Sequence, residues 1–510
     1  MPQAHVASPR LTVRLFKTIS RETVDGKSAV SSRYQGKDDY IDLTPFLGDG
    51  STVRTSKSVR EPAGAWSITV TDQPQESFMS AVGLGQKELE SLSGLVEPMD
   101  VIEIRMWSGV GSAPQEYPII MRGFVSDITR QQVMTSAGRP QRTVTISGQD
   151  YGKIWQMFQV IYLAAYSERQ ALLTNFNLWE MFGSEAKTAT PAGEFVRTMI
   201  EKVINPHIDG FMPPYTPMPR KVQTGDSIAV AHGVVNNSYQ QMQGSIYDIL
   251  RFHGDVGVWN ELYTEDREDG VHCVYRPIPA LHITAPEGKD RKIQDDAPDP
   301  VYVEIPDGFV ISVALSRNDS NVANFYWVGN ARFDLIDEMQ RKLASIPADD
   351  GKVSLKEYPN TAVKYYGVRL MQGETQQGDD ALANLTSGQK EAPQENRSGK
   401  QEAWIDKRRR LMMEMNKDNV VFERGTARIK GGPLRPDGVE SMKAGDYALF
   451  TFGQMRWEAY VVQVEHEFVM YQGYTTTLTL ERATNFIARS SMESGSQSPW
   501  LAEQATRQGI

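Results

Sequence analysis

The chain has 510 residues, of which 40% are hydrophobic and 23% are charged, and its formal net charge is −10. This composition is typical of a globular protein, and the length predicts roughly three or four domains of about 150 residues each. The negative charge disfavours a general grip on nucleic acid, which needs clustered lysine and arginine. It suits a surface over which DNA slides without sticking.

The single cysteine, Cys273, excludes an internal disulfide and a zinc site built from cysteines. No apolar run approaches the ~20 residues of a transmembrane helix, so we expect no membrane insertion. The N-terminus lacks the apolar core of a signal peptide. These features are consistent with synthesis in a reducing compartment.

The N-terminal part of the chain predicts a β-rich unit. Apolar and polar side chains alternate from Leu11 to Phe16 and around Trp66, as expected for half-buried strands. Asp38–Phe46 predicts a short strand and Lys87–Leu95 a short helix. Three further strands are predicted between Asp100 and Ser147.

From Gly148 the apolar period changes, which indicates a mixed α+β region. Helices are predicted in 148–166, in Thr190–Ile204 with Thr190 as cap and Pro191 at the first position, and in Ser245–Val256 with Gly254 at its end. A Pro-rich loop is expected over 206–221, and a hairpin over 257–279.

The C-terminal part predicts a second β-rich unit with an insertion. Strands are expected at Val301–Ile305, Gly308–Ala314 and Val420–Ile429. The insertion between them predicts a helix at 333–343, a strand at 364–371, a mobile polar loop at 372–400 and an amphipathic helix at 404–415.

The stretch Gly445–Arg482 predicts three antiparallel strands, and the same design occurs earlier in the chain. "DVIEIRMW" matches "DYALFTF", "GFVSDITR" matches "AYVVQVEH", and "TVTIS" matches "TLTLE". In this alignment Phe124, Ser126 and Ile128 take the face of Tyr460, Val462 and Val464. Upstream, Ala63–Val70 resembles Val322–Val328. We interpret this as one β-barrel unit that occurs twice.

The predicted fold class is therefore α+β, mainly β, with two similar antiparallel barrels. The predicted domains are a first barrel (1–150), a mixed α+β domain (151–300), a second barrel (301–330 and 420–485), an insertion (331–419) and a C-terminal tail (486–510).

A search for catalytic, cofactor-binding and metal-binding motifs predicts none of these sites. The sequence has no P-loop, no H-E-x-x-H and no G-x-S-x-G motif. Gly83–Lys87 lacks the context of a phosphate loop. Glu465–Glu467 contains metal-ligand types, but on a strand His466 points away from both glutamates, so a structural role is favoured.

The remaining candidates are weak. Asp38, Asp39 and Asp42 could serve a divalent ion or a glycosidase-type pair, but no second partner can be placed. Lys407–Arg410 is interpreted as a solvated helix face, with an acidic docking partner as the alternative. Cys273 is expected to be a small buried group. The scattered histidines are expected to be structural: His207, His232, His253, His272 and His282.

The two copies of a "D-strand, G/A-strand, T-strand" barrel around a helix-rich domain resemble the hub proteins of phage tails. This family includes the late-control-protein-D type and the N-terminal part of type VI secretion spike proteins. The resemblance extends to "VTISGQDY", "SIYDILRFHG" and "AVKYYGVR", and it covers most of residues 1–485. The polar insertion at 372–400 departs from it.

The resemblance implies a non-enzymatic structural protein of the virion, made in the host cytoplasm, without cofactors. It implies a homotrimeric ring that adapts a six-fold tail tube to a three-fold central spike, contacts other baseplate proteins and lines the DNA channel. Two alternatives stay open: a tail-associated cell-wall hydrolase, and a peripheral host-binding tail component.

Overall fold

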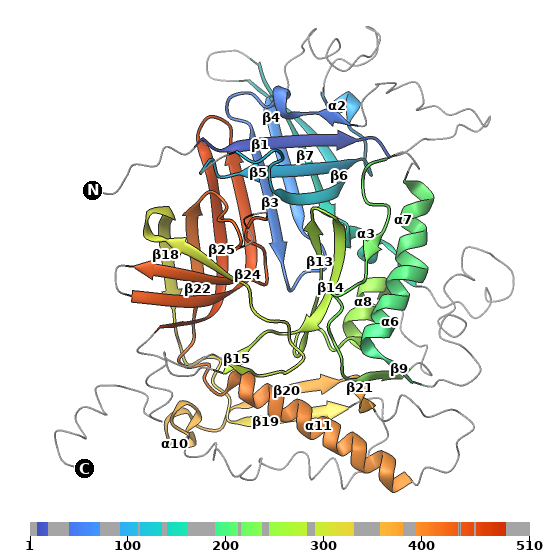
Figure 1. Cartoon of the computed structure of the whole chain (residues 1–510), viewed down its shortest axis with the longest axis vertical. Coiled ribbons are helices and arrows are strands. Elements are labelled where there is room, and N and C mark those ends of the chain that lie inside the picture. Colours follow the sequence, from blue (N-terminus) through green and yellow to red (C-terminus); the bar gives the residue numbers. More distant parts are fainter. Residues whose placement is uncertain are drawn as a thin grey trace, which may run out of the picture.

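The computed structural model describes most of the chain in fourteen stretches: residues 8–18, 40–71, 92–110, 113–134, 140–160, 189–212, 216–236, 244–282, 291–330, 358–380, 394–436, 438, 440–452 and 455–485. Most of its strands belong to one large curved sheet, beside which a helical region and a small separate layer lie (Figure 1).

The first β unit supplies one half of this sheet. Its strands are β1 (Arg10–Phe16), β2 (Ile41–Asp42), β3 (Thr52–Ser58), β4 (Ala65–Thr71), β5 (Val101–Trp107), β6 (Ile119–Met134) and β7 (Pro140–Asp150). A 3-10 turn at Thr44–Phe46 and the short helix α2 (Leu92–Leu95) lie between them. The helix predicted at 87–95 is confirmed for its last four residues, and its first part lies outside the described residues.

The second β unit supplies the other half. Its strands are β17 (Tyr302–Pro306), β18 (Val310–Ser316), β22 (Glu423–Lys430), β23 (Tyr447–Phe452), β24 (Met455–Val469) and β25 (Gly473–Asn485), with a 3-10 turn at Asp307–Phe309. The strands predicted for this unit are confirmed, and β24 and β25 extend beyond their predicted ends.

The two units join edge to edge in a 13-stranded sheet. Its order is β18-β22-β25-β24-β3-β4-β7-β6-β5-β1-β2, and β23 and β17 branch from β24. Each unit retains a core of its own, since the apolar faces of the two halves gather in separate buried clusters. The sequence predicts two separate barrels, whereas the described strands pair as one continuous sheet.

The mixed region lies against this sheet. Its helices are α3 (Gly152–Met157), α6 (Ala192–Met199), a π-helical turn (Ile200–Ile204), α7 (Asn205–Phe211) and α8 (Ile246–His253), and its main hairpin is β13 (Asn260–Arg267) with β14 (Gly270–Pro277). Short strands complete it: β8 (Gln159–Val160), β9 (Ala189–Pro191), β10 (Val222–Gln223), β11 (Val234–Asn236), β12 (Gly244–Ser245), β15 (Leu281–His282) and β16 (Arg291–Lys292).

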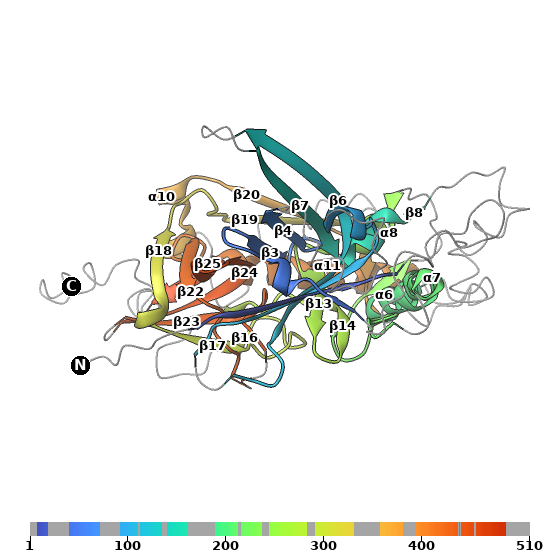
Figure 2. The same cartoon turned by 90° about the horizontal axis from the view of Figure 1, so that it is seen from above.

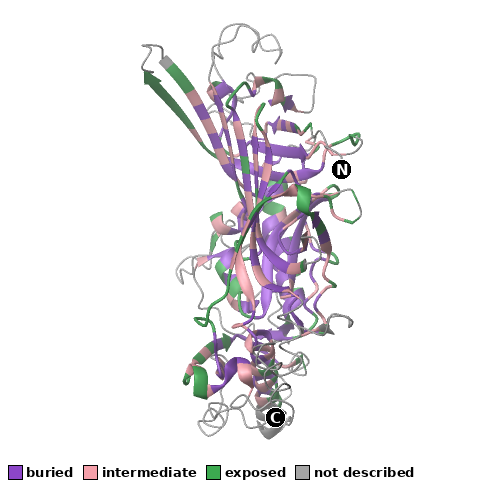
Figure 3. Cartoon of the chain, turned by 90° about the vertical axis from the view of Figure 1, so that its left-hand side faces the viewer, coloured by how far each residue is buried: buried purple, intermediate pink, exposed green. Residues whose placement is uncertain are grey.

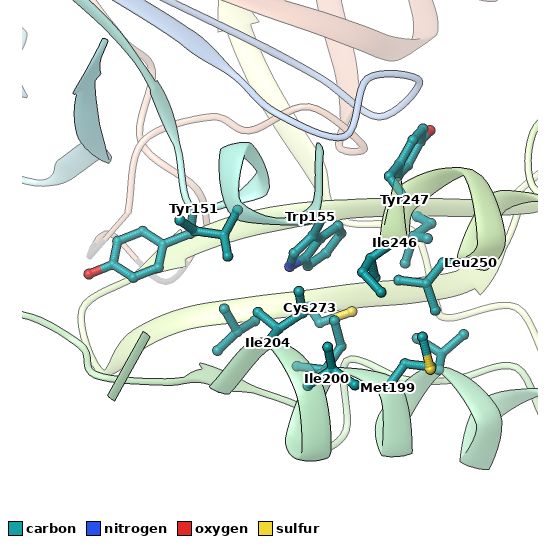
Figure 4. Close-up of a cluster of buried hydrophobic side chains, with 14 of the residues drawn as sticks. Tyr151, Trp155, Met199, Ile200, Ile204, Ile246, Tyr247, Leu250 and Cys273 are labelled. Atoms are coloured by element: carbon teal, nitrogen blue, oxygen red, sulfur yellow. The ribbon is translucent and has the colours of Figure 1, made fainter. Parts of the chain in front are cut away.

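Apolar side chains from α3, α6, the π-helical turn, α8 and β14 form the core of the mixed region (Figure 4). The prediction for α8 is confirmed in detail. Ser245 caps it in a reciprocal capping box with Asp248, and Gly254 follows its last residue. The hairpin is confirmed as well.

Three predictions for this region are corrected. The helix predicted at 148–166 is helical only over Gly152–Met157 among the described residues, since β7 extends to Asp150 and Gln159–Val160 is strand β8. Thr190 lies in β9 and Pro191 is the N-cap of α6, so the helix begins at Ala192 rather than at the proline. The Pro-rich stretch predicted as a loop begins as helix α7, because Pro206 stands in the first turn, where no backbone N–H is needed.

The insertion forms a separate layer, and this layer also takes in Phe325–Asn330, which the sequence assigned to the second barrel. It contains β19 (Phe325–Asn330), a 3-10 turn (Pro359–Thr361), α10 (Val363–Tyr366), β20 (Leu370–Thr375), β21 (Gln377–Gly378) and α11 (Gln394–Asn416). β19 pairs in parallel with β20, and α11 packs against β19. Figure 1 shows this layer, in yellow and orange, below the main sheet.

Several predictions for the insertion are corrected. The strand predicted at 364–371 begins only at Leu370, because Val363–Tyr366 is helical. The loop predicted at 372–400 contains strand residues at its start, where Thr375 and Gln377 are fully buried, and the beginning of α11 at its end. The amphipathic helix at 404–415 is confirmed as part of α11. The helix predicted at 333–343 and the tail at 486–510 lie outside the described residues.

Candidate assembly interface

Both β units follow one strand order, which is the central feature of the sheet. In the first unit neighbours run β3-β4-β7-β6-β5, and in the second β18-β22-β25-β24-β23. These strands also follow each other in the same order along the chain. One pairing differs: β1 runs antiparallel to β5, whereas β17 runs parallel to β23.

A β-bulge at the same place fixes the correspondence residue by residue. The ladder of β6 with β7 shifts between Val125 and Asp127, and that of β24 with β25 shifts between Val461 and Gln463. Ser126 therefore corresponds to Val462. This is the alignment predicted from the sequence, and the match of β5 with β23 holds as well.

The predicted match of the third strands is shifted by two residues. Ser147 pairs with Asp127 and Thr479 pairs with Gln463, so Ser147 corresponds to Thr479 rather than to Glu481. The Thr-x-Thr pattern repeats every two residues, and a slip of two residues leaves it unchanged. The predicted match of Ala63–Val70 with Val322–Val328 is wrong, because β19 lies outside the main sheet. β22 takes the place of β4.

The turn before the central strands is also duplicated. The Asp100 carboxylate accepts the backbone N–H of Glu97 at 2.8 Å, and the Asp446 carboxylate accepts that of Lys443 at 2.9 Å. The preceding residues, Met99 and Gly445, both have positive φ (73° and 95°). Burial raises the pKa of Asp100 to about 6 despite Lys17, and burial raises the pKa of Asp446 to about 6 despite Arg435.

At one equivalent residue pair, the glycine lies on opposite strands in the two units. Trp66 of β4 lies opposite Gly148 of β7, whereas at the corresponding pair Gly425 of β22 lies opposite Leu480 of β25. A Cβ on Gly148 would meet the Trp66 ring at 2.5 Å, so this glycine leaves room for the tryptophan. A Cβ on Gly425 would instead meet the backbone of Ala314 on β18, so the two glycines relieve different contacts.

The junction between the units is the ladder of β24 with β3. It runs antiparallel from Gln463 opposite Ser58 to Val469 opposite Thr52. Arg54 donates to Glu467 across the junction at 2.6 Å, and Gln463 donates to Ser56 at 3.0 Å. One edge of β24 pairs with β25 of its own unit along almost its whole length, whereas the other edge pairs first with β23 and then, from Gln463, with β3 of the other unit.

One face of the sheet is rich in hydroxyl groups across both units. Two arginines of this face, Arg428 and Arg54, both pair with Glu467. A shallow depression follows this face over the junction. The face is neither apolar nor strongly charged. Half-exposed or exposed hydroxyls on it are Ser56, Ser67, Thr69, Thr145, Ser147, Thr426, Thr477 and Thr479.

Buried ion pairs attach the β13–β14 hairpin to the first unit. Lys57 contacts Asp150, and both contact the Thr264 hydroxyl, at 2.6 and 2.9 Å. Burial lowers the pKa of Lys57 to about 8. Arg105 and Arg122, which both donate to Glu103, also reach the hairpin: Arg105 donates to Glu268 at 2.9 Å, and Arg122 donates to the carbonyl of Arg267 at 2.7 Å.

A second buried cluster attaches the hairpin to the second unit. Arg276 of β14 donates to Glu261 at 3.0 Å, to the carbonyl of Gly445 at 3.2 Å and to the Tyr460 hydroxyl at 3.3 Å. Burial, and then the Glu261 charge, raise the pKa of Tyr460. The hairpin therefore clamps both halves of the sheet. No motif in the sequence marks these groups, because their partners are distant in the chain.

The metal-ligand types at Glu465–Glu467 form no site. His466 is buried and contacts the hydroxyls of Tyr474 at 2.8 Å and Thr476 at 3.0 Å, whereas both glutamates lie on the other face. Burial lowers the pKa of His466 to about 3. Within the described residues no three His, Cys, Asp or Glu side chains gather as a metal site would require.

The other candidates are also accounted for locally. Asp42 accepts the N–H of Thr44 at 2.9 Å, while Asp38, Asp39 and Gly83–Lys87 lie outside the described residues. The histidines are dispersed: His207 lies against Phe158, His253 against Phe195, His232 and His272 beside aspartates, and His282 in β15. Cys273 is buried in the core of the mixed region, and burial raises its pKa.

The interpretation of Lys407–Arg410 as a solvated face is corrected. Arg408 is buried, with its guanidinium 4.4 Å from the ring centroid of Trp404 and 5.4 Å from that of Trp259. It donates to Gln377 at 3.0 Å. Arg408 therefore fastens α11 to β21 and the mixed region, and only part of the run faces water.

No helix among the described residues is long and apolar enough to cross a membrane. No protein-family model and no curated protein matches the chain. Among solved structures, the chain is similar to the 43 kDa tail protein of prophage MuSo2 from Shewanella oneidensis (TM-score 0.41, 9% identity, 94% of this chain and 98% of that chain covered).

Two further similar structures are a tail protein from Neisseria meningitidis MC58 (TM-score 0.42, 10% identity, 96% and 99% covered) and prophage tail protein gp18 from Listeria monocytogenes EGD-e (TM-score 0.38, 8% identity, 95% and 98% covered). A component of the Escherichia coli type VI secretion system is similar at a TM-score of 0.33 and 6% identity, with 86% and 74% covered.

Proposed function

We propose that this chain is a structural hub of a bacteriophage tail or baseplate. Three copies form a ring that joins a six-fold tail tube to a three-fold central spike. The observation that carries the proposal is the duplicated β unit, whose two copies share strand order, bulge and corner turn within one sheet.

The duplication supplies the symmetry that such an adaptor needs. A ring of three chains with two equivalent units each presents six similar units to a tube on one side. The mixed region and the insertion occur once per chain, and they therefore present three-fold symmetry to a spike. Closed rings are a usual outcome when homo-oligomers bury one patch against a different one.

The hydroxyl-rich face suits the wall of a DNA channel. Arg54 and Arg428 on this face are both held by Glu467, which draws them away from phosphate groups. The net charge of −10 adds a repulsive background. DNA would pass such a wall without specific binding during ejection.

A non-enzymatic role accords with the local roles of the candidate residues. Asp42 accepts a backbone N–H within a turn, and His466 is buried against two hydroxyl groups, so each makes a structural contact. The hydrolase and the host-binding alternatives gain no specific support from the described residues.

The test is the position and stoichiometry of the chain. Native mass spectrometry of the purified protein should give a trimer, and end-on averaged images should show six density lobes. Antibodies against the chain should label the axis of the tail tip in virions. Labelling at the periphery, or a stable dimer or tetramer, would contradict the proposal, and turnover of peptidoglycan by the purified chain would favour the hydrolase.

A further inference from the structure

Among the described residues, the sheet of one chain has two edges without a strand partner, and these edges match each other. β18 is the terminal strand on the side of the second unit. On the side of the first unit, β6 pairs with β5 only as far as Phe124, and Val125 makes further backbone hydrogen bonds there. Beyond the bulge, the edge of β6 that faces away from β7 has no strand partner among the described residues.

The distal part of β6, residues 126–134, stands away from the body of the molecule. Figure 2 shows the β6–β7 hairpin projecting beyond the sheet, and Figure 3 shows its outer end as exposed. β18 lies apart from the β6–β7 hairpin in Figure 2, and β6 and β18 do not pair with each other in the sheet of one molecule. Val133 and Met134 are 50% and 62% exposed, and Ile311 of β18 is 46% exposed.

β18 lacks the devices that protect an edge strand which stays in water. Its sequence, VISVALS, contains no charge and no proline. Natural edge strands that remain uncovered are usually blunted by such residues, since a bare edge templates pairing with another chain. This edge is therefore expected to be covered in the assembled state.

The chain contains the template for that cover. By the strand correspondence, β6 is equivalent to β24 and β18 is equivalent to β3. β24 uses its distal half to pair with β3, which is as long as β18, at seven residues each. The position that β3 occupies beside β24 is therefore empty beside the distal part of β6, and β18 has no strand on its outer edge among the described residues.

We propose that the distal edge of β6 pairs with β18 of a second copy of this chain, antiparallel, repeating the β24–β3 junction. That this pairing closes into a ring rests on the function proposed above. The match between the two edges follows from the internal duplication alone. It is heterologous, because each copy offers one edge of each kind, and such contacts generate rings when the rotation closes.

The correspondence also fixes the register. Val313 pairs with Ala427 as Val53 pairs with Ile68, so Ala314 takes the place of Arg54. Gln131 takes the place of Glu467 by the bulge alignment.

Because Glu467 lies opposite Arg54, Gln131 lies opposite Ala314 of the next copy. By the same rule Thr129 lies opposite Ser316 of the next copy, and Val133 lies opposite Ser312 of the next copy.

The test is cross-linking between copies through introduced cysteines. Gln131→Cys and Ala314→Cys each replace an exposed side chain, so folding is preserved. The native Cys273 is buried with a raised pKa and serves as an unreactive background. Opposite residues of an antiparallel pair lie within the Cα separation that a disulfide needs.

Mixing the two single variants under mild oxidation should give a disulfide-linked dimer, and the double variant should give a ladder that ends in a closed species. The matched control combines Gln132→Cys with Ala314→Cys. A one-residue slip turns the side chain to the opposite face, so its cross-linked yield should be about tenfold lower.

Three results would overturn the proposal: no cross-link in the mixture, equal yields for the two registers, or preferential linking of identical single variants. Failure of the tail location is a separate result. A cross-linked ring that antibodies do not find in virions would keep the pairing and refute the hub function.

Discussion

The exchange of glycine and a large residue between the two units predicts an overpacking defect at Gly148. A Cβ built on Gly148 would lie 2.5 Å from Cζ2 of Trp66 and closer still to the carbonyl oxygen of Phe124. Ordinary carbon contacts need at least about 3.5 Å, so β7 would have to move by roughly 1 Å. Both obstacles lie in paired strands and cannot simply rotate away.

Gly148→Ala should therefore destabilise the protein by about 1–3 kcal/mol, the usual cost of overpacking. This exceeds the gain of about 0.8 kcal/mol from burying one methyl group. The assay is urea unfolding followed by tryptophan fluorescence. Gly308→Ala is the control, because a Cβ there has no neighbour within 4 Å and φ is not positive. A Gly148→Ala protein as stable as the control would refute the pairing of Trp66 with Gly148.

Three further predictions concern buried polar groups. The pKa of Asp446 is raised from 3.8 to about 6, so its contribution to stability is present below pH 3.8 and is lost as the pH rises through 6. The free energy of unfolding of Asp446→Asn, measured by urea unfolding, should therefore rise relative to that of the wild type by about 3 kcal/mol between pH 4 and pH 7. Parallel pH profiles of the two proteins would contradict this. The pKa of His466 is lowered from 6.5 to about 3, so its contribution to stability is present above pH 6.5 and is lost as the pH falls toward 3. The wild type should lose about 3 kcal/mol of unfolding free energy through this group from pH 7 to pH 4, and His466→Asn should not show this loss. An equal pH dependence in both proteins would refute the buried neutral imidazole. Arg408→Met should release the hydrogen bond to Gln377 and speed amide exchange in β20 and β21, whereas the exposed Arg410→Met should not; equal protection in both variants would show that Arg408 does not fasten this layer.

The sequence was sufficient where a local pattern and the final packing agree. The alternation in β23, β24 and β25 marks half-buried strands, and the bulge confirms the predicted alignment of β6 with β24. The helix α8 was predictable at both ends, because Ser245 caps it and Gly254 follows it. These signals depend on residues a few positions apart, which a single sequence displays directly.

Two parts of the interface could not be found this way. β3 is rich in Ser, Thr, Lys and Arg, so it carries little apolar alternation, and its role depends on β24 more than four hundred positions away. The polar start of the insertion is buried because distant segments supply its hydrogen-bond partners. Thr375 donates to Asp255, and Gln377 donates to the carbonyl of His253 and accepts from Arg408. Composition alone predicts a solvated loop there.

The misplaced partner of β4 shows why divergent repeats hide from sequence comparison. β4 carries Trp66, Ile68 and Val70 on its buried face, and Val322–Val328 imitates that apolar pattern better than the true equivalent does. β22 presents Gly425 and Ala427 at the same places, which reads as a weak strand. Its pattern is weak because Gly425 stands where β4 has Trp66, and a Cβ at Gly425 would meet the backbone of Ala314 on β18. The equivalence of β22 and β4 is visible only once the register is known, because it rests on their pairing with β25 and β7 and not on similar side chains.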